Sequence, residues 1–309
     1  MGEANRHLQF LCIGAQKAGT TWLYENLRHQ PGIWLPPVKE IHYFDHTRPS
    51  TWKRLTSEAT HHKSARQHLF DCLWDVTRGK KKSADLSLAW HIALGDRDDA
   101  WYDKLFSWSN QEIAGEICPG YARLSAEQIE ELAKRYPNLK IIYMLRDPVD
   151  RAWSSVAMHF RKNSDDLVTS KAEDQILGKL LQWKRFGHCS YMRNIENWTR
   201  FFPREQIYFG FFDRLAGDPS GLLGEVLAFL GVDAPVASVQ LEKAVNAGQG
   251  ERISRNVEKR LSALLLGETE GLHNHLDNAY TAQWLDHVRS ALTPSGADKL
   301  SANLTAESR

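Results

Sequence analysis

The sequence lacks the cysteine spacing of a zinc ribbon or a disulfide framework. Four cysteines are spread along 309 residues, at Cys12, Cys72, Cys118 and Cys189, and no two of them form a CxxC pair. This usage is typical of a protein from a reducing compartment. Carboxylates paired at a metal-binding spacing are also missing, so the sequence predicts no metal site.

A long apolar segment is missing as well. No run approaches the roughly 20 apolar residues that a membrane helix needs, and the opening MGEANRHLQF lacks the apolar centre of a signal peptide. We therefore expect a cytoplasmic protein that does not contact a membrane. The charges nearly cancel, since 39 basic and 38 acidic residues leave a formal net charge of +1. The sequence thus predicts no nucleic-acid partner, and any anion site must be local.

Alternating strand and helix patterns predict an α/β fold. Apolar runs with strand character occur at 8–13, 32–37, 139–146 and 206–212. Helical patterns stand between and after them, at 20–29, 124–136, 191–202, 218–231, 255–266 and 284–292, with a further helix starting near Pro148. Such alternation implies a parallel sheet of about five strands with helices on both faces, in three layers. We expect a single domain over 1–309, with a helical insertion at about 47–109.

The segment from Gly14 to Trp22, GAQKAGTTW, carries the strongest functional signal. A strand that ends in glycines before a helix directs backbone N–H groups and the positive helix end at one point, which suits a phosphate or sulfate. An ATP-binding P-loop would have lysine after its second glycine, where Thr20 stands, whereas here the lysine comes earlier, at Lys17. The alternative is a tight turn with a surface lysine.

Together with LRDPVDRAWS at 145–154, this segment resembles the sulfotransferases that use 3′-phosphoadenosine-5′-phosphosulfate (PAPS). The pattern is similar to heparan-type and bacterial members, and it lacks the KxxxTVxxxE dimer signature of the animal cytosolic enzymes. The resemblance implies a P-loop-like α/β fold and transfer of a sulfuryl group from PAPS to an acceptor, with release of adenosine 3′,5′-bisphosphate (PAP). It also implies chemistry without a metal.

The resemblance further implies which residues bind the donor. Lys17 would contact the bridging oxygen and the sulfonate, and the 5′-phosphate would lie on the segment made of Ala18, Gly19, Thr20, Thr21 and Trp22. Arg146 and Ser154 match the positions that hold the 3′-phosphate, where a guanidinium and a hydroxyl suit this anion. The alternative is that Arg146 pairs with Asp147 or Asp150 and that Ser154 faces solvent.

Glu40 and His42 in VKEIHYFD are the candidates for the base that takes the acceptor's proton. By resemblance to the heparan-type relatives, the catalytic base falls on Glu40, and Lys39 would hold the donor or keep Glu40 charged. The sequence leaves the choice between Glu40 and His42 open. The alternative is an exposed Lys39–Glu40 pair beside a packed histidine.

One position departs from the heparan-type pattern, in which a second active-site lysine precedes a Pro-x-Tyr segment. Ile117 stands there, so either another cation such as Lys39 replaces it or the acceptor is unlike a polysaccharide. We expect a small-molecule acceptor such as a natural product, with a pocket that draws on aromatic and imidazole side chains of the insertion, among them Trp90, His91, Trp101 and Tyr102. Two rival functions are a P-loop kinase and a non-catalytic nucleotide-binding module. A late glycine loop with Gly248, Gly250 and Arg252 is a weaker candidate for a donor contact.

Overall fold

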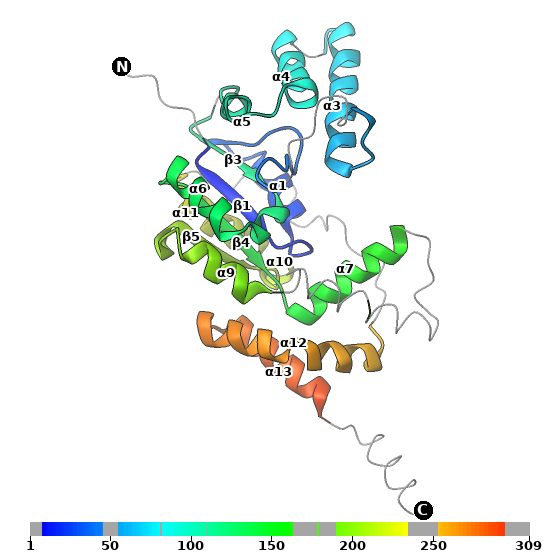
Figure 1. Ribbon diagram of the computed structural model, residues 1–309, viewed down its shortest axis with the longest axis vertical. Coiled ribbons are helices and arrows are strands. Elements are labelled where there is room, and N and C mark those ends of the chain that lie inside the picture. The colour runs from blue at the N-terminus through cyan, green and yellow to red at the C-terminus, as the bar shows by residue number, and fades with distance from the viewer. Residues whose placement is uncertain are drawn as a thin grey trace, which may run out of the picture. The chain divides into compact units, whose positions relative to one another are not determined.

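The computed structural model describes residues 8–45, 55–80, 82–109, 111–162, 178, 190–233 and 253–293 (Figure 1). The chain divides into two compact units, one made of 1–145 with 194–246 and the other of 146–193 with 247–309. The predicted single domain therefore stays a prediction. None of the helices in the described ranges combines the length and the apolar character needed to cross a membrane.

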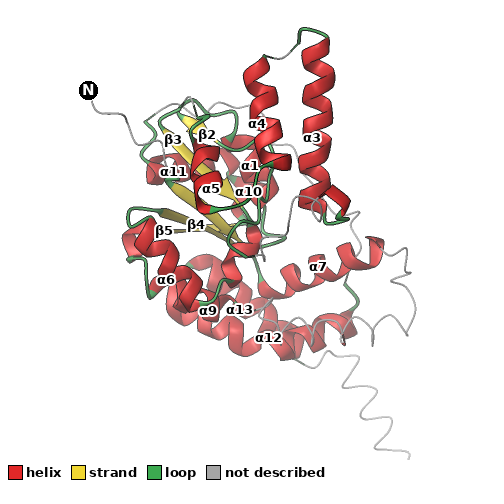
Figure 2. Ribbon diagram, turned by 45° about the horizontal axis from the view of Figure 1, so that its top comes forward, coloured by secondary structure: helices red, strands yellow, loops and turns green. Residues whose placement is uncertain are grey.

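The first unit is built on a five-stranded sheet. Its strands are β1 (Phe10–Gly14), β2 (Ile33–Trp34), β3 (Ile113–Ile117), β4 (Lys140–Leu145) and β5 (Ile207–Phe211). All neighbouring pairs are parallel, and the order is β2-β3-β1-β4-β5, which places β1 in the middle. Figure 2 shows the strands of this sheet in yellow. The sheet confirms the predicted α/β class with a central parallel sheet.

Several helices begin or end at residues that carry a local capping signal. They are α1 (Thr20–Leu27), α3 (Thr60–Thr77), α4 (Ser83–Leu94), α5 (Asp99–Phe106), α6 (Ala126–Arg135), α7 (Pro148–Lys162), α9 (Tyr191–Thr199), α10 (Arg214–Gly217), α11 (Pro219–Leu230), α12 (Arg255–Leu276) and α13 (Ala279–Leu292), with short 3₁₀ helices at Pro119–Arg123 and Arg204–Gln206. The carboxylate of Asp218 accepts from the Gly221 amide at 2.8 Å, and Gly231 ends α11 with φ 87°. The last two helices are longer than their sequence patterns predict.

Strand β3 is the element that the sequence pattern misses. Its sequence IAGEI places Glu116 in a buried strand, which breaks the apolar run that signals such strands. The structure compensates for this charge with two tyrosine hydroxyls and a backbone amide, as described below. Gly115 is required at this point, because a Cβ there would lie 2.3 Å from the ring of Phe10 on β1.

The predicted insertion is helical over its described part, which contains α3, α4 and α5. Trp101 and Tyr102 of α5 are buried, and the ring of Tyr102 stacks on that of Tyr43 with a centroid distance of 4.3 Å. These two aromatic residues are therefore core residues that support the 38–45 loop. Trp90 is exposed instead.

The second unit has its own apolar core. Val149, Ala152 and Val156 of α7 pack with residues of α12 and α13, namely Val257, Leu261, Leu265 and Val288. The carboxylate of Asp147 accepts from the Val149 amide at 2.8 Å and from that of Asp150 at 3.2 Å, which satisfies the start of α7. The predicted glycine loop at 248–252 and Cys189 lie outside the described residues.

Candidate active site

The predicted donor loop joins the central strand to α1. β1 ends at Gly14, and the Ala15 amide donates to the Met144 carbonyl of β4 at 2.6 Å, which fixes the start of the loop against the sheet. Helix α1 then begins at Thr20 after Gly19, and no side chain of the described residues caps it. The first amides of α1 and the positive helix end therefore face the loop, as an anion site requires.

Gly19 cannot be replaced without a rearrangement. Its φ is 84°, in the left-handed region that favours glycine. A Cβ at this position would also lie 2.8 Å from Leu215 and 3.2 Å from Phe212. The close approach of these side chains explains why a glycine precedes α1. Trp22 is buried in the core, so only its backbone amide is suited to face an anion.

Three candidate catalytic residues share an unusual backbone conformation. Among the described non-glycine residues, Lys17, Glu40 and His42 have positive φ values of 70°, 61° and 55°, together with Asp277 at the end of α12. The left-handed conformation costs roughly 1 kcal/mol or more for each such residue. Strain of this kind persists only where the surrounding contacts impose it, and it tends to cluster at functional sites.

Glu40 and His42 form an ion pair within the 38–45 loop. The Nε2 of His42 lies 3.6 Å from an oxygen of Glu40, and its Nδ1 donates to Asp45 at 2.8 Å. On the other side of Glu40, the ammonium of Lys39 lies 3.0 Å from Oε1. These charges alternate in sign along the loop, so each carboxylate contacts at least one cation.

The charges of this loop separate the roles of Glu40 and His42. Burial raises the pKa of Glu40, but hydrogen bonds and charges from His42 and Lys39 outweigh it and hold the pKa at about 2. Burial lowers the pKa of His42, yet Asp45 and Glu40 raise it to about 9. At neutral pH Glu40 is therefore ionised and His42 is protonated. Of these two residues, only Glu40 then has a free position for a proton, and its low pKa makes it a weak base.

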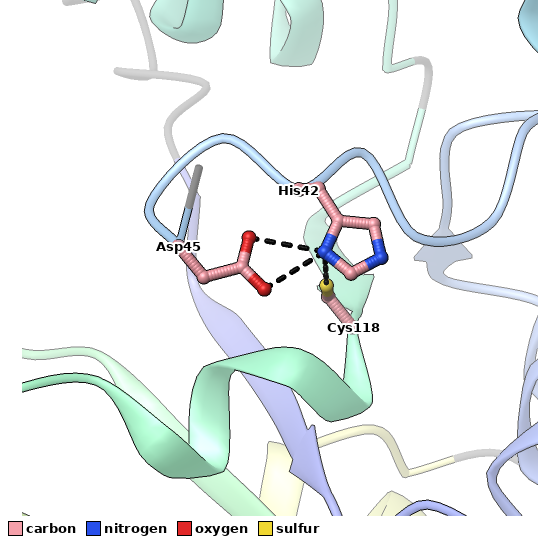
Figure 3. Close-up of side chains that lie close together, drawn as sticks. All are labelled: His42, Asp45 and Cys118. Carbon is pink, nitrogen blue, oxygen red and sulfur yellow. Dashed lines mark hydrogen bonds and ion pairs between the residues drawn. The ribbon is translucent and has the colours of Figure 1, made fainter. Parts of the chain in front are cut away.

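Asp45 is the functional candidate that the sequence reasoning missed. It is half-buried, and Figure 3 shows its carboxylate directed at the imidazole of His42. The signal was present, because Asp45 is the last residue of VKEIHYFD and lies three positions after His42. Asp45 holds the proton on Nδ1 and fixes the orientation of the ring.

His42, Asp45 and Cys118 also form the group in the described ranges whose ligand atoms lie close enough for a metal ion, all within 4.8 Å of one another (Figure 3). The Sγ of Cys118 lies 3.5 Å from Nδ1 of His42. Burial raises the pKa of the Cys118 thiol well above its usual range, and Nδ1 already carries the proton that it donates to Asp45. The arrangement therefore suits an ion pair better than a metal, which would have to displace that proton.

Glu116 anchors the loop from the neighbouring strand. Its Oε1 accepts from the Ile41 amide at 2.9 Å, and its other oxygen accepts from the hydroxyl of Tyr102 at 2.6 Å. The hydroxyl of Tyr121 donates to Glu116 at 3.0 Å and accepts from the Tyr43 amide at 2.8 Å. Burial raises the pKa of Glu116 to about 7 despite these donors. The network fixes the backbone on both sides of His42.

Ile117 follows Glu116 on β3 and offers no charge. Its side chain is 1% exposed, and its register partner is Cys12 on β1. The cation that the heparan-type pattern has at this position is therefore not supplied by β3.

Arg146 and Ser154 belong to the second unit. The Arg146 amide donates to the hydroxyl of Tyr191 at 3.2 Å, and its guanidinium lies 3.8 Å from Asp150. Ser154 is half-buried on α7, two turns after the start of that helix. The structure thus gathers Lys39, Glu40, His42 and the donor loop in one unit, whereas the role of Arg146 and Ser154 in holding a 3′-phosphate stays a prediction.

The chain is similar in sequence to known sulfotransferases. The human heparan sulfate glucosamine 3-O-sulfotransferase 3B1 is 26% identical over 285 residues, which are 89% of this chain and 59% of that protein. The mouse heparan sulfate glucosamine 3-O-sulfotransferase 6 is 31% identical over 229 residues, which are 74% of this chain and 53% of that protein. The chain therefore spans little more than half the length of these relatives.

The fold is also similar to that of solved structures. A sulfotransferase from Alicyclobacillus acidocaldarius superposes with a TM-score of 0.58 at 22% identity, covering 90% of this chain and 98% of that one. The family model described as the sulfotransferase family matches residues 9–235, most of the chain. The chain belongs to the sulfotransferase family.

Proposed function

We propose that the chain is an enzyme that transfers the sulfuryl group of PAPS to a hydroxyl or amine of an acceptor and releases PAP. One observation carries the proposal: Lys39 connects the start of α1 with Glu40, its ammonium lying 3.1 Å from Thr21 Oγ1 and 3.0 Å from Glu40 Oε1. An anion-binding helix start and a proton acceptor therefore lie beside each other. Sulfuryl transfer requires both.

The donor loop stabilises the leaving group. In the reaction, the bond between sulfur and the bridging oxygen breaks, and its electron pair goes to the 5′-phosphate. The amides of Ala18, Gly19, Thr20, Thr21 and Trp22 and the ammonium of Lys17 would meet this growing charge, so they bind the transition state better than the ground state. Arg146 and Ser154 would bind the 3′-phosphate.

Glu40 takes the proton of the acceptor. A new bond forms between sulfur and the acceptor's oxygen or nitrogen, and the proton leaves for the Glu40 carboxylate. His42 stays protonated beside Glu40, and Asp45 keeps it so. His42 is in this scheme a positioning residue that also stabilises the negative charge around the reacting atoms.

The proposal includes a small-molecule acceptor. The sequence predicts a small molecule, whereas the names of the relatives refer to heparan sulfate, a polysaccharide. PAP release should therefore be measured with libraries of alcohols, phenols and amines and, in parallel, with heparan sulfate. The proposal for a small molecule fails if only the polysaccharide is turned over. The cytoplasmic location and the absence of a metal remain predictions.

Two variants test the proposed roles. Lys17→Ala should abolish turnover and weaken PAPS binding, because it removes the cation at the bridging oxygen. Glu40→Gln should keep PAPS binding and lose at least about 100-fold in turnover, the usual contribution of a general base. Unchanged turnover in the glutamine variant would remove Glu40 from the mechanism and leave His42 as the candidate.

The same assay separates the rival functions. A P-loop kinase would transfer a phosphoryl group from ATP and would require magnesium, so PAP release from PAPS in the presence of EDTA excludes it. A non-catalytic nucleotide-binding module would bind PAPS or PAP without releasing PAP in the presence of any acceptor.

A further inference from the structure

Lys39 occupies a bridging position that the donor-loop scheme leaves unused. Its ammonium lies 3.4 Å from Thr20 Oγ1, 3.1 Å from Thr21 Oγ1 and 3.0 Å from Glu40 Oε1. It thus reaches both the first turn of α1 and the proposed base. Its side chain is 17% exposed, so it is largely withdrawn from water.

The chain on both sides of Lys39 is fixed. Val38 and Ile41 are buried, at 5% and 1% exposure. The Ile41 amide donates to Glu116, and its carbonyl accepts from Arg97 at 2.8 Å. Before Lys39, the carbonyl of Pro36 accepts from the hydroxyl of Tyr24 at 2.8 Å. The ammonium is therefore held at this place by the fold, at a cost of about 1.5–2 kcal/mol in side-chain entropy.

Two of the three partners of the ammonium do not balance its charge. The hydroxyls of Thr20 and Thr21 are neutral, and the carboxylate of Glu40 also faces the protonated His42. The three N–H donors of the ammonium are all engaged, so an anion would bind by taking the place of a neutral threonine hydroxyl.

We propose that Lys39 is a catalytic residue whose ammonium binds the sulfonate oxygens of the bound donor. The inference rests on the proposed function and deepens it. In-line displacement places the sulfonate between the leaving phosphate and the attacking atom, whose proton goes to Glu40. A cation that contacts both the start of α1 and Glu40 lies at the level of the sulfonate. There it would neutralise the charge on the three sulfonate oxygens as they become planar.

The apolar character of Ile117 fits this assignment. β3 presents a buried isoleucine there, so the cation that faces the sulfonate comes from the loop after β2. Lys17 would then contact the bridging oxygen from the donor loop, and Lys39 the transferred group from the opposite loop.

Comparing the affinities for PAPS and PAP isolates the contribution of the sulfonate to binding. Both ligands carry the 5′-phosphate and the 3′-phosphate, but only PAPS carries the sulfonate. Dissociation constants for both should be measured by titration calorimetry on the full chain, for the wild type, Lys39→Met and Lys39→Arg. Lys134→Met serves as the matched control, because Lys134 lies on the exposed face of α6 and pairs only with Glu130 among the contacts found for it.

The expected result is a loss of affinity for PAPS but not for PAP. Lys39→Met should weaken PAPS binding about 10- to 100-fold, the range for a hydrogen bond to a charged group, and should leave PAP binding within about twofold of the wild type. Lys39→Arg should keep the wild-type ratio of the two dissociation constants, and Lys134→Met should change neither constant.

An equal loss for PAPS and PAP in Lys39→Met would overturn the inference, because Lys39 would then bind the 5′-phosphate or support the fold. No loss for either ligand would overturn it as well. If Lys39→Met does not fold, Lys39→Gln takes its place, because it removes the charge but keeps a polar side chain. An equal loss for PAPS and PAP in that variant, or no loss, refutes a role for this cation at the sulfonate. Failure of the proposed function looks different, because the wild type itself would then bind neither PAPS nor PAP, or would bind them without releasing PAP with any acceptor.

Discussion

Replacing Asp45 by asparagine tests the charged state assigned to His42. The structure raises the pKa of His42 from 6.5 to about 9, which corresponds to about 3 kcal/mol of preference for the imidazolium at about 1.4 kcal/mol for each pH unit. Burial lowers the pKa of His42, and the carboxylates of Asp45 and Glu40 together raise it. Asp45→Asn should therefore lower the pKa of His42 by roughly one pH unit or more.

His42 contributes to the free energy of unfolding in a pH-dependent way, because its pKa differs between the folded and the unfolded protein. A group whose pKa is raised by folding stabilises the protein fully below its unfolded pKa, near 6.5, and loses this contribution as the pH rises through its folded pKa of about 9. Asp45→Asn should therefore lower the free energy of unfolding by about 1–3 kcal/mol at pH 6 and by clearly less at pH 10, where His42 is neutral in both proteins.

Urea unfolding followed by tryptophan fluorescence at pH 6 and pH 10 measures these differences, and NMR titration of the labelled imidazole reports the pKa of His42 directly. Asp218→Asn is the matched control. Asp218 lies 2.7 Å from the guanidinium of Arg214, which does not titrate in this range, so the substitution should lower the free energy of unfolding equally at both pH values. If Asp45→Asn also costs the same at pH 6 and pH 10, the assignment of a protonated His42 is wrong.

Two further predictions concern one position in each unit. Gly19→Ala should lower the melting temperature and abolish measurable PAPS binding, because the new Cβ would lie 2.8 Å from Leu215 at a φ of 84°. Differential scanning fluorimetry measures the melting temperature and calorimetry the binding, and a normal affinity for PAPS would contradict the prediction. Asp147→Asn should destabilise the second unit by about 1–3 kcal/mol at pH 6, because Asp147 caps α7 and its hydrogen bond to His287 is the main cause that raises the pKa of His287 to about 9. Thermal unfolding should show a smaller loss at pH 10, once His287 is neutral, and an equal loss would argue against this pair.

In the second unit, local sequence signals predict the start of a helix but not its long-range contacts. Pro148 predicted the start of α7, and the structure begins the helix at that residue. The pairing of Asp147 with His287 joins positions 140 apart in the chain, and no local pattern indicates it. The same contrast holds for strand β3, whose Glu116 hides it from hydropathy but is satisfied by Tyr102 and Tyr121.

The sequence by itself determined the donor loop and the class of fold. A strand, a glycine turn and a helix start are contiguous in GAQKAGTTW, and their anion-binding property depends on backbone geometry that local residues set. The place of Lys17 within this loop separated it from ATP loops, and Glu40 and His42 stood together in one short segment. The comparisons place the chain in the family that these motifs indicate.

Only the tertiary structure decided the charge states of Glu40 and His42 and the role proposed for Lys39. The pKa values of Glu40 and His42 depend on burial and on the orientation of charged neighbours, neither of which is written in local sequence. The Lys39 ammonium meets Thr20 and Thr21 from 19 and 18 positions away, and Glu116 holds Ile41 across 75 positions. Long-range packing of loop, helix and strand creates these contacts, which is why the sequence could name the residues but not their charges or partners.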